Sequence, residues 1–242
     1  KEPLPRFFIG RLEEMKRSEI NAILRDAKTF LEERKITLPP FALWTPEDWA
    51  AKGHECDEIR DNMLGWDITD FGQGDFSKVG LLLITTRNGN QKQSKRYPKP
   101  YAEKIMIVRE DQVTPMHYHW SKMEDIINRG GGNLVIKLYN SIHENELDTE
   151  SDIHVTLDGE RKVFPAGAEV VLHPGQSITL TQGLFHRFWG EPGKGTVLVV
   201  EVSMCNDDNI DNNFYDKVGR FPQIEEDEAP LHYLCNEYPA AK

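Results

Sequence analysis

The feature that most restricts the fold is a series of short β-type segments that begins near Phe71 and has no helical pattern between its members. Clusters of Gly, Asn, Asp and Pro separate segments rich in branched and aromatic residues. The segments are residues 81–86, 105–109, 134–139, 153–157, 169–172, 177–180 and 196–202. Closely spaced strands without helices between them favour an antiparallel sandwich or barrel over a parallel sheet. Residues 87–90 and 157–160, which contain Asn-Gly and Asp-Gly, are predicted hairpin turns.

The N-terminal part of the chain has a helical pattern instead. Apolar residues recur at intervals of three and four from about Met15, as Ile20, Ile23, Leu24, Ala27, Phe30 and Leu31. Pro39 and Pro40 end this helix, and Thr45 followed by Pro46 predicts the start of a second. We therefore predict a helical extension over residues 15–70, packed on a barrel formed by residues 71–242. Residues 1–14 are predicted to be an irregular extension, which an expression tag could supply.

Composition excludes several classes of protein. The chain has 242 residues, with 40 acidic against 29 basic residues and a net charge of -11, which disfavours binding to nucleic acid or to anionic membranes. No apolar run is long enough to span a bilayer, and the first ten residues lack the apolar stretch of a signal peptide. Three widely separated cysteines indicate neither a disulfide framework nor a thiolate zinc site. We expect a globular protein of the cytoplasm.

The stretch Thr114 to Glu124 contains a candidate metal site. Residues two apart on a strand share a face, so His117 and His119 can present imidazole nitrogens to one point. The chain can curl back to add Glu124, and His186, after a glycine turn, is the best distant fourth ligand. Imidazole and carboxylate ligands without thiolate suit manganese, iron, cobalt and zinc alike.

These motifs carry a resemblance to the cupin superfamily. The HxHxxxxE pattern of His117, His119 and Glu124, followed by Gly131, resembles the first cupin motif, and the stretch from Gly175 to His186 resembles the second. The departures are Asp111 for the usual glycine, Thr181 for the usual proline and Gly190 for the usual asparagine, which affect turns more than ligands. The resemblance implies a mainly β fold, a single cupin barrel (a double-stranded β-helix or jelly roll) with the helical extension at its N-terminus.

A more specific resemblance covers nearly the whole chain from Met15 onward. Residues 101–106, 113–120, 124–134 and 234–238 are similar to bacterial D-lyxose isomerases. This similarity implies that His117, His119, Glu124 and His186 bind one divalent ion, usually Mn²⁺, with Fe²⁺, Co²⁺ or Zn²⁺ as alternatives. It also implies an aldose–ketose isomerase that interconverts D-lyxose with D-xylulose and often D-mannose with D-fructose. We expect a homodimer that acts on a small free monosaccharide.

Isomerisation also needs a group that moves a proton between two carbons. Glu201 interrupts the apolar run of residues 196–202, and alternation would place it on the face of Val197 and Val199, pointing into the barrel. Glu201 is therefore the predicted catalytic acid and base, although a buried lysine or arginine or an exposed strand edge would also explain it. Lys104, at the start of another apolar run, is predicted to bind a sugar oxygen and to assist catalysis, with a solvated strand end as the alternative.

The remaining substrate-binding candidates are polar loop residues and aromatic residues. Asp207 is predicted to bind a sugar hydroxyl at the pocket mouth, and Arg220 is a second polar candidate, although charged loops are more often solvated. Trp120 and Phe188 are predicted to stack on the sugar, with core packing as the alternative. Two other classes of protein stay open at this point: a non-haem iron cupin dioxygenase and a non-catalytic sugar-binding cupin.

Overall fold

The N-terminal part of the computed structural model consists of one long helix and several short ones. The structure describes residues 14–143, 145–205 and 207–242. The short strand β1 (Met15–Lys16) leads into α1 (Arg17–Glu33). The predicted apolar face of this helix is confirmed, because Ile20, Leu24 and Leu31 are buried while most of the charged residues between them are exposed. The predicted irregular extension over residues 1–14 lies outside the described residues except for Glu14.

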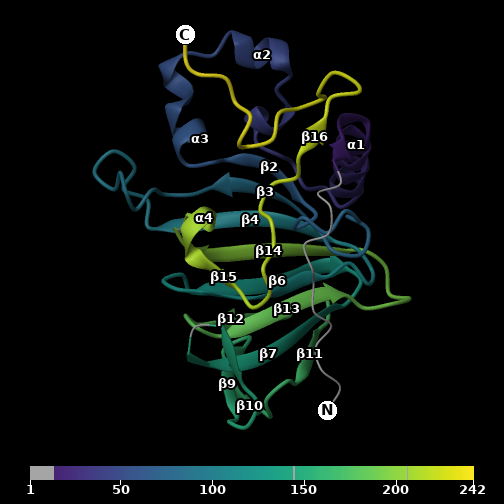
Figure 1. Ribbon diagram of the computed structural model, residues 1–242, viewed down its shortest axis with the longest axis vertical. Helices are drawn as coiled ribbons and strands as arrows, with labels where there is room; N and C mark the ends of the chain where they lie inside the picture. Colours follow the sequence, from purple (N-terminus) through teal and green to yellow (C-terminus); the bar gives the residue numbers. More distant parts are fainter. Residues whose placement is uncertain (1–13, 144, 206) are drawn as a thin grey trace.

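The short helices that follow are η1 (Pro40–Leu43), α2 (Pro46–Ala50), η2 (His54–Cys56) and α3 (Asp57–Asp61). The predicted start of the second helix is confirmed. The Asp48 amide donates to Thr45 Oγ1 at 3.2 Å, and the Thr45 amide donates to Asp48 Oδ2 at 2.9 Å, which completes a capping box. Figure 1 shows the helices α1, α2 and α3 together at the end of the molecule where β2 and β3 lie.

Two antiparallel sheets contain most of the strands among the described residues. The larger sheet has, among the described residues, the strand order β10 (Glu160–Phe164), β9 (Ile153–Leu157), β12 (Ser177–Leu180), β6 (Glu124–Gly131), β14 (Val197–Met204), β4 (Tyr101–Val108), β3 (Leu81–Arg87) and β2 (Gly65–Thr69). The smaller sheet has the order β11 (Glu169–Leu172), β7 (Leu134–His143), β13 (Phe185–Gly190), β5 (Thr114–His119) and β15 (Asn212–Phe214), and β8 (Glu146–Asp148) pairs with β7. The prediction of a mainly β fold is confirmed.

Alternation along the strands divides the apolar residues between two cores. In β14, Val197 and Val199 belong to the core between the sheets, together with Leu134 and Ile136 of the facing sheet. Leu198 points the other way and packs in a second core with residues of α1. The helical region therefore packs on the outer face of the larger sheet at strands β2, β3, β4 and β14. The same alternation sends Glu201 of β14 toward the space between the sheets.

The C-terminal segment returns to the N-terminal helix. The strand β16 (Ile224–Glu225) pairs in parallel with β1. Arg17 is only 1% exposed, and its Nη2 lies 2.6 Å from a carboxylate oxygen of Glu226 and 2.5 Å from one of Glu237. This part of the predicted barrel segment, residues 71–242, thus packs against α1. Figure 1 shows the C-terminal segment running alongside the helical end of the molecule.

Two local features differ from the sequence predictions. Residues 65–69, within the predicted helical extension, form β2 and pair with β3. The predicted hairpin turn at residues 87–90 is wrong, because β3 ends at Arg87 and β4 begins only at Tyr101. Gly89 instead allows the backbone at Lys99 to come close, since a Cβ at position 89 would lie 1.8 Å from the Lys99 carbonyl oxygen. The turn at residues 157–160 is confirmed, with positive φ angles at Asp158 and Gly159.

No helix among the described residues combines the length and the apolar character that crossing a membrane requires.

Candidate metal centre and catalytic cavity

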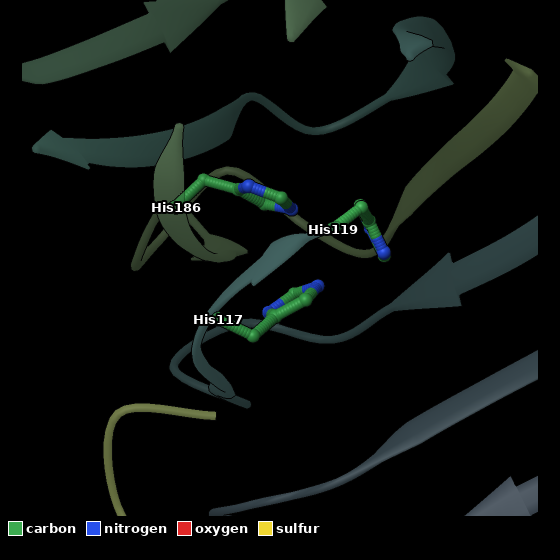
Figure 2. Close-up of side chains that lie close together, drawn as sticks. All are labelled: His117, His119 and His186. Atoms are coloured by element: carbon green, nitrogen blue, oxygen red, sulfur yellow. The ribbon is translucent and has the colours of Figure 1, made fainter. Parts of the chain in front are cut away.

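Three of the predicted ligands meet inside the barrel. His117 and His119 lie on β5, and His186 lies on the neighbouring strand β13, where it is the register partner of His117. One ring nitrogen from each histidine lies within 4.8 Å of the other two, and all three side chains are buried. Figure 2 shows the three rings around a common space. Pairing of the two strands therefore unites residues that are far apart in the sequence.

Backbone contacts fix the tautomer of two of these rings in their neutral form. His117 Nδ1 lies 2.7 Å from the Pro115 carbonyl oxygen, and His186 Nδ1 lies 3.0 Å from that of Leu184. A carbonyl oxygen can only accept, so each Nδ1 donates and the Nε2 of the neutral ring keeps its lone pair. Burial, helped by the neighbouring histidines, holds the pKa of His117 well below its usual 6.5. A neutral imidazole is the form that binds a metal ion.

Glu124, the first residue of β6, completes the cluster. Its Oε1 lies 3.4 Å from His119 Nε2 and 3.2 Å from His186 Nε2. Burial alone would raise the pKa of Glu124, but the charge of Lys122 holds it well below its usual range. The carboxylate is therefore ionised.

This arrangement suits a bound cation. His186 Nε2 is buried and has no hydrogen-bond partner among the described residues, yet it faces a carboxylate oxygen at 3.2 Å. Two acceptors at that distance repel each other unless a positive charge lies between them. Three imidazole nitrogens and one carboxylate are ligands that divalent transition metals accept. The residues thus fit the predicted divalent metal ion.

A buried network of opposite charges adjoins the cluster. Lys122 Nζ lies 2.7 Å from Glu124 Oε2 and 2.8 Å from Glu201 Oε1. Glu201 Oε1 also accepts from Ser203 Oγ at 2.9 Å and lies 3.5 Å from Lys104 Nζ. Burial would lower the pKa of Lys122, but the charges of Glu124 and Glu201 raise it above its usual value. The predicted catalytic pair, Glu201 and Lys104, is thereby placed next to the predicted metal ligands.

The network ends at α4 (Asp208–Asp211). Lys104 Nζ lies 3.0 and 2.9 Å from the two carboxylate oxygens of Asp208. Burial would raise the pKa of Asp208, but the charges of Lys104 and Lys122 hold it far below its usual value. In the same helix, Asp211 accepts from the Ser121 amide and hydroxyl at 2.8 and 2.6 Å, and its other oxygen lies 3.7 Å from His119 Nδ1.

These groups surround a cavity of about 60 Å³, which we call the catalytic cavity. Its walls contain all four predicted metal ligands together with Lys104, Lys122, Phe188, Glu201, Asp208 and Arg220. Three predicted substrate-binding residues, Lys104, Phe188 and Arg220, therefore line it. Arg220 donates to both carboxylate oxygens of Asp67, at 3.1 and 2.5 Å.

The other two predicted substrate-binding residues lie outside the catalytic cavity. Trp120 is 49% exposed and packs edge-on against Tyr118. Asp207 lines a neighbouring cavity and pairs with Lys92 at 2.7 Å. The next residue, Asp208, lines both cavities.

Three charged residues of the site escaped the sequence analysis: Lys122, Asp208 and Asp211. Lys122 carried a usable signal, because it lies two residues before Glu124 and can share its direction in an extended chain. Asp208 and Asp211 lie in a polar stretch rich in Asn and Asp, where nothing local singles them out.

A family model and two sequence relatives all indicate similarity to D-lyxose isomerases. The D-lyxose isomerase family description matches residues 15–238. A D-lyxose/D-mannose isomerase of Escherichia coli O157:H7 is 50% identical over 93% of this chain and 98% of its own length. One from Serratia proteamaculans shares the same identity and coverage.

Solved structures support the same fold. An L-ribose isomerase of Cellulomonas parahominis, solved with L-ribose, superposes with a TM-score of 0.56 at 13% identity over 89% of this chain and 99% of its own. The Geodermatophilus obscurus L-ribose isomerase gives 0.57 at 15% identity, over 89% and 100%. The predicted cupin-type fold is thereby confirmed.

The fold, the buried polar cavity and these relatives together define an aldose–ketose isomerase with a cupin-type barrel. More particularly, the chain belongs to the D-lyxose isomerase family. This membership makes the protein an isomerase, so neither a dioxygenase nor a non-catalytic sugar-binding cupin is retained as an alternative.

Proposed function

We propose that this enzyme interconverts D-lyxose with D-xylulose, and D-mannose with D-fructose, using one divalent metal ion held by His117, His119, Glu124 and His186. The observation that carries the proposal is the unpartnered Nε2 of His186 facing the Glu124 carboxylate, directly beside the buried pair of Lys122 and Glu201. The names of the relatives that are 50% identical support the choice of sugars.

The metal would supply positive charge to the oxygens on C1 and C2 of the sugar. Four protein ligands leave two positions for these oxygens if the ion is six-coordinate, which favours Mn²⁺ over a tetrahedral zinc site. Fe²⁺, Co²⁺ and Zn²⁺ are the alternatives that the experiment below separates.

Glu201 would move the proton. Its contacts with Lys122, Ser203 and Lys104 among the described residues all involve Oε1, so Oε2 is the oxygen left for the substrate. This oxygen would take the proton from C2 of the aldose and return it to C1 through an enediol. Lys104 and Lys122 hold the carboxylate in place and supply positive charge for the oxygen that becomes negative during the transfer.

The residues around the cavity exclude bulk water and bind the sugar. Phe188 would pack against a C–H face of the substrate, and Arg220 would donate to a hydroxyl. We propose that the enzyme works as a homodimer in the cytoplasm on free monosaccharides, without nucleic acid or membrane as partners. Trp120 keeps only a peripheral role in this proposal, because it does not line the catalytic cavity, whereas Asp207 lines the neighbouring cavity.

One assay tests the proposed function. Protein stripped with a chelator is offered D-lyxose and D-mannose with Mn²⁺, Fe²⁺ (under anaerobic conditions), Co²⁺ or Zn²⁺ in turn, and ketose formation is followed. We expect no turnover without metal and the fastest turnover with Mn²⁺. Failure on both sugars with every metal would contradict the substrate assignment. Full turnover by the stripped protein would contradict only the metal requirement.

A further inference from the structure

A second, larger cavity adjoins the catalytic one. It measures about 310 Å³ and shares Asp208 and Arg220 with the wall of the catalytic cavity. None of the four predicted metal ligands lines it. Its lining is dominated by polar side chains, among them Asp61, Thr85, Asn90, Gln93 and Asn209. We call it the distal cavity, because Asp208 and Arg220 separate it from the metal ligands.

The catalytic cavity is too small for a whole sugar. A space of about 60 Å³ corresponds to roughly four to six water positions. A five-carbon sugar carries an oxygen on every carbon and would share this space with a metal ion. The part of the substrate beyond the reacting carbons would then extend past the lining residues. The distal cavity has the size of an ordinary small-molecule site.

The wall between the two cavities can form hydrogen bonds with hydroxyl groups. It contains two ion pairs, Lys104 with Asp208 and Arg220 with Asp67. Both terminal nitrogens of Arg220 donate to Asp67, whereas its Nε is buried and has no hydrogen-bond partner among the described residues. A buried N–H without an acceptor costs free energy, which a sugar hydroxyl at the wall would recover.

We infer that the distal cavity binds the tail of the sugar chain beyond C3, while C1 and C2 lie in the catalytic cavity. The inference rests on the proposed function and adds the basis of its substrate range. D-Lyxose and D-mannose share their configuration at C2, C3 and C4, and D-mannose has one additional CHOH unit in the tail. That unit would lie in the distal cavity, whose polar lining and volume tolerate it. One catalytic site can then act on both a pentose and a hexose.

Thr85 provides a test of this assignment. It lies two residues after Leu83 on β3 and faces the same side, but Leu83 lines the catalytic cavity and Thr85 the distal cavity. Thr85→Leu adds volume to the distal cavity without changing a residue of the catalytic one. We expect kcat/KM to fall at least about tenfold more for D-mannose than for D-lyxose, the scale on which a pocket discriminates one carbon unit.

Thr86→Leu is the matched control. Thr86 is the next residue on the strand, points to the opposite face and donates to the Glu103 backbone and side chain. It should leave the ratio of the two kcat/KM values unchanged. Equal losses for both sugars in Thr85→Leu would overturn the inference. Metal content and thermal unfolding of both variants establish that they are folded.

A measurement on the unaltered enzyme decides the question if Thr85→Leu does not fold. Aldoses of five, six and seven carbons with the same configuration at C2 to C4 are compared by kcat/KM. We expect the six- and seven-carbon sugars to differ by less than about tenfold, because the added unit enters a roomy polar space. A fall beyond a hundredfold at the seventh carbon overturns the distal assignment while the proposed function stands. No turnover of any of the three overturns both.

Discussion

Lys122 and Glu201 form an ion pair of 2.8 Å in the interior of the barrel, with side chains that are only 1% and 7% exposed. The same ammonium group lies 2.7 Å from Glu124. One lysine therefore pairs with both the predicted metal-ligating carboxylate and the predicted catalytic carboxylate. Charges removed from water to this extent are tolerated only when they are paired. The pair thus links the stability of the barrel to the chemistry of the site.

Removing Lys122 should destabilise the protein strongly. Lys122→Met keeps the length of the side chain but leaves Glu124 and Glu201 without their shared partner. We expect the metal-free variant to lose about 3–5 kcal/mol of unfolding free energy, measured by urea denaturation at neutral pH. Lys137→Met is the control, since Lys137 pairs with Glu169 at 2.9 Å and Glu169 is 48% exposed. It should cost about 1 kcal/mol or less, and similar losses in both variants would contradict the argument.

Glu201→Gln should separate catalysis from folding. The amide has nearly the same shape as the carboxylate but cannot accept and return the proton. We expect turnover of D-lyxose to fall on the order of a hundredfold or more, while metal content stays at the level of the unaltered protein. Glu169→Gln, on the exposed end of a surface pair, should retain full activity. Near-normal turnover in Glu201→Gln would remove this residue from the proton transfer and direct attention to Lys104 and Asp208.

The position of Glu201 was predictable because it depends on local geometry alone. Alternation along a strand determines which face a side chain occupies, and β14 keeps the alternation from Val197 through Glu201. The partner of Glu201 was not predictable in the same way. Lys122 lies 79 residues earlier in the chain, and only the pairing of β14 with β6, together with the path of the chain between His119 and Glu124, brings the two together.

The difference between local geometry and distant contacts also explains why the sequence did not indicate the roles of Asp208, Asp211 and Gly89. Asp208 and Asp211 act through contacts with Lys104 and Ser121, which lie about a hundred residues away in the sequence. The Asn88-Gly89 dipeptide has the composition of a tight turn, but the approach of the Lys99 carbonyl uses the glycine for a different purpose. The role of a polar loop residue depends on the strands and helices around it. A single sequence does not show how those strands pair, so it does not show which side chains a loop residue will contact.

Replacing any one of the four predicted metal ligands should reduce metal content and turnover together. His117→Ala, His119→Ala, Glu124→Ala and His186→Ala each remove one ligand from a shared shell, so metal content and turnover should fall in parallel. The readouts are metal analysis after dialysis and initial rates at saturating metal. His154→Ala, which changes an exposed histidine of β9, should alter neither. Any of the four variants with normal metal content and normal turnover would remove that residue from the ligand set.

The route of the hydrogen can be read from isotope exchange. If Glu201 carries a proton between C2 and C1 through an enediol, that proton can exchange with solvent while it is on the carboxylate. Isomerisation of D-lyxose in D₂O should then leave deuterium at C1 of the product, detected by NMR or mass spectrometry. Product without deuterium at early and late times would favour direct hydride transfer, unless exchange in this enclosed cavity is slower than turnover. A slower variant such as Lys104→Arg tests that exception, because it gives the proton more time to exchange.

The pH dependence of the metal-free protein should reflect its buried histidines. Burial lowers the pKa of His117 far below 6.5, and burial together with the charge of Lys122 lowers the pKa of His119. Below pH 6.5 the unfolded chain takes up protons on these residues and the folded protein does not, so stability is fully present above pH 6.5 and is lost as the pH falls. The linkage slope is at most about 1.4 kcal/mol per pH unit for each histidine. Glu124, whose pKa is lowered, adds a loss of the same sign only below about pH 4.5.

Urea denaturation of chelator-treated protein at pH 7.5, 6.0 and 5.0 measures this loss. His232 also has a pKa lowered by burial and contributes in the same range, so the decisive comparison is between variants. His117→Gln should show a shallower decline than the unaltered protein, by up to about 1.4 kcal/mol per pH unit between pH 6 and 5. His154→Gln, at an exposed position, should keep the full slope. Parallel curves for His117→Gln and the unaltered protein would show that His117 takes up its proton in the folded state.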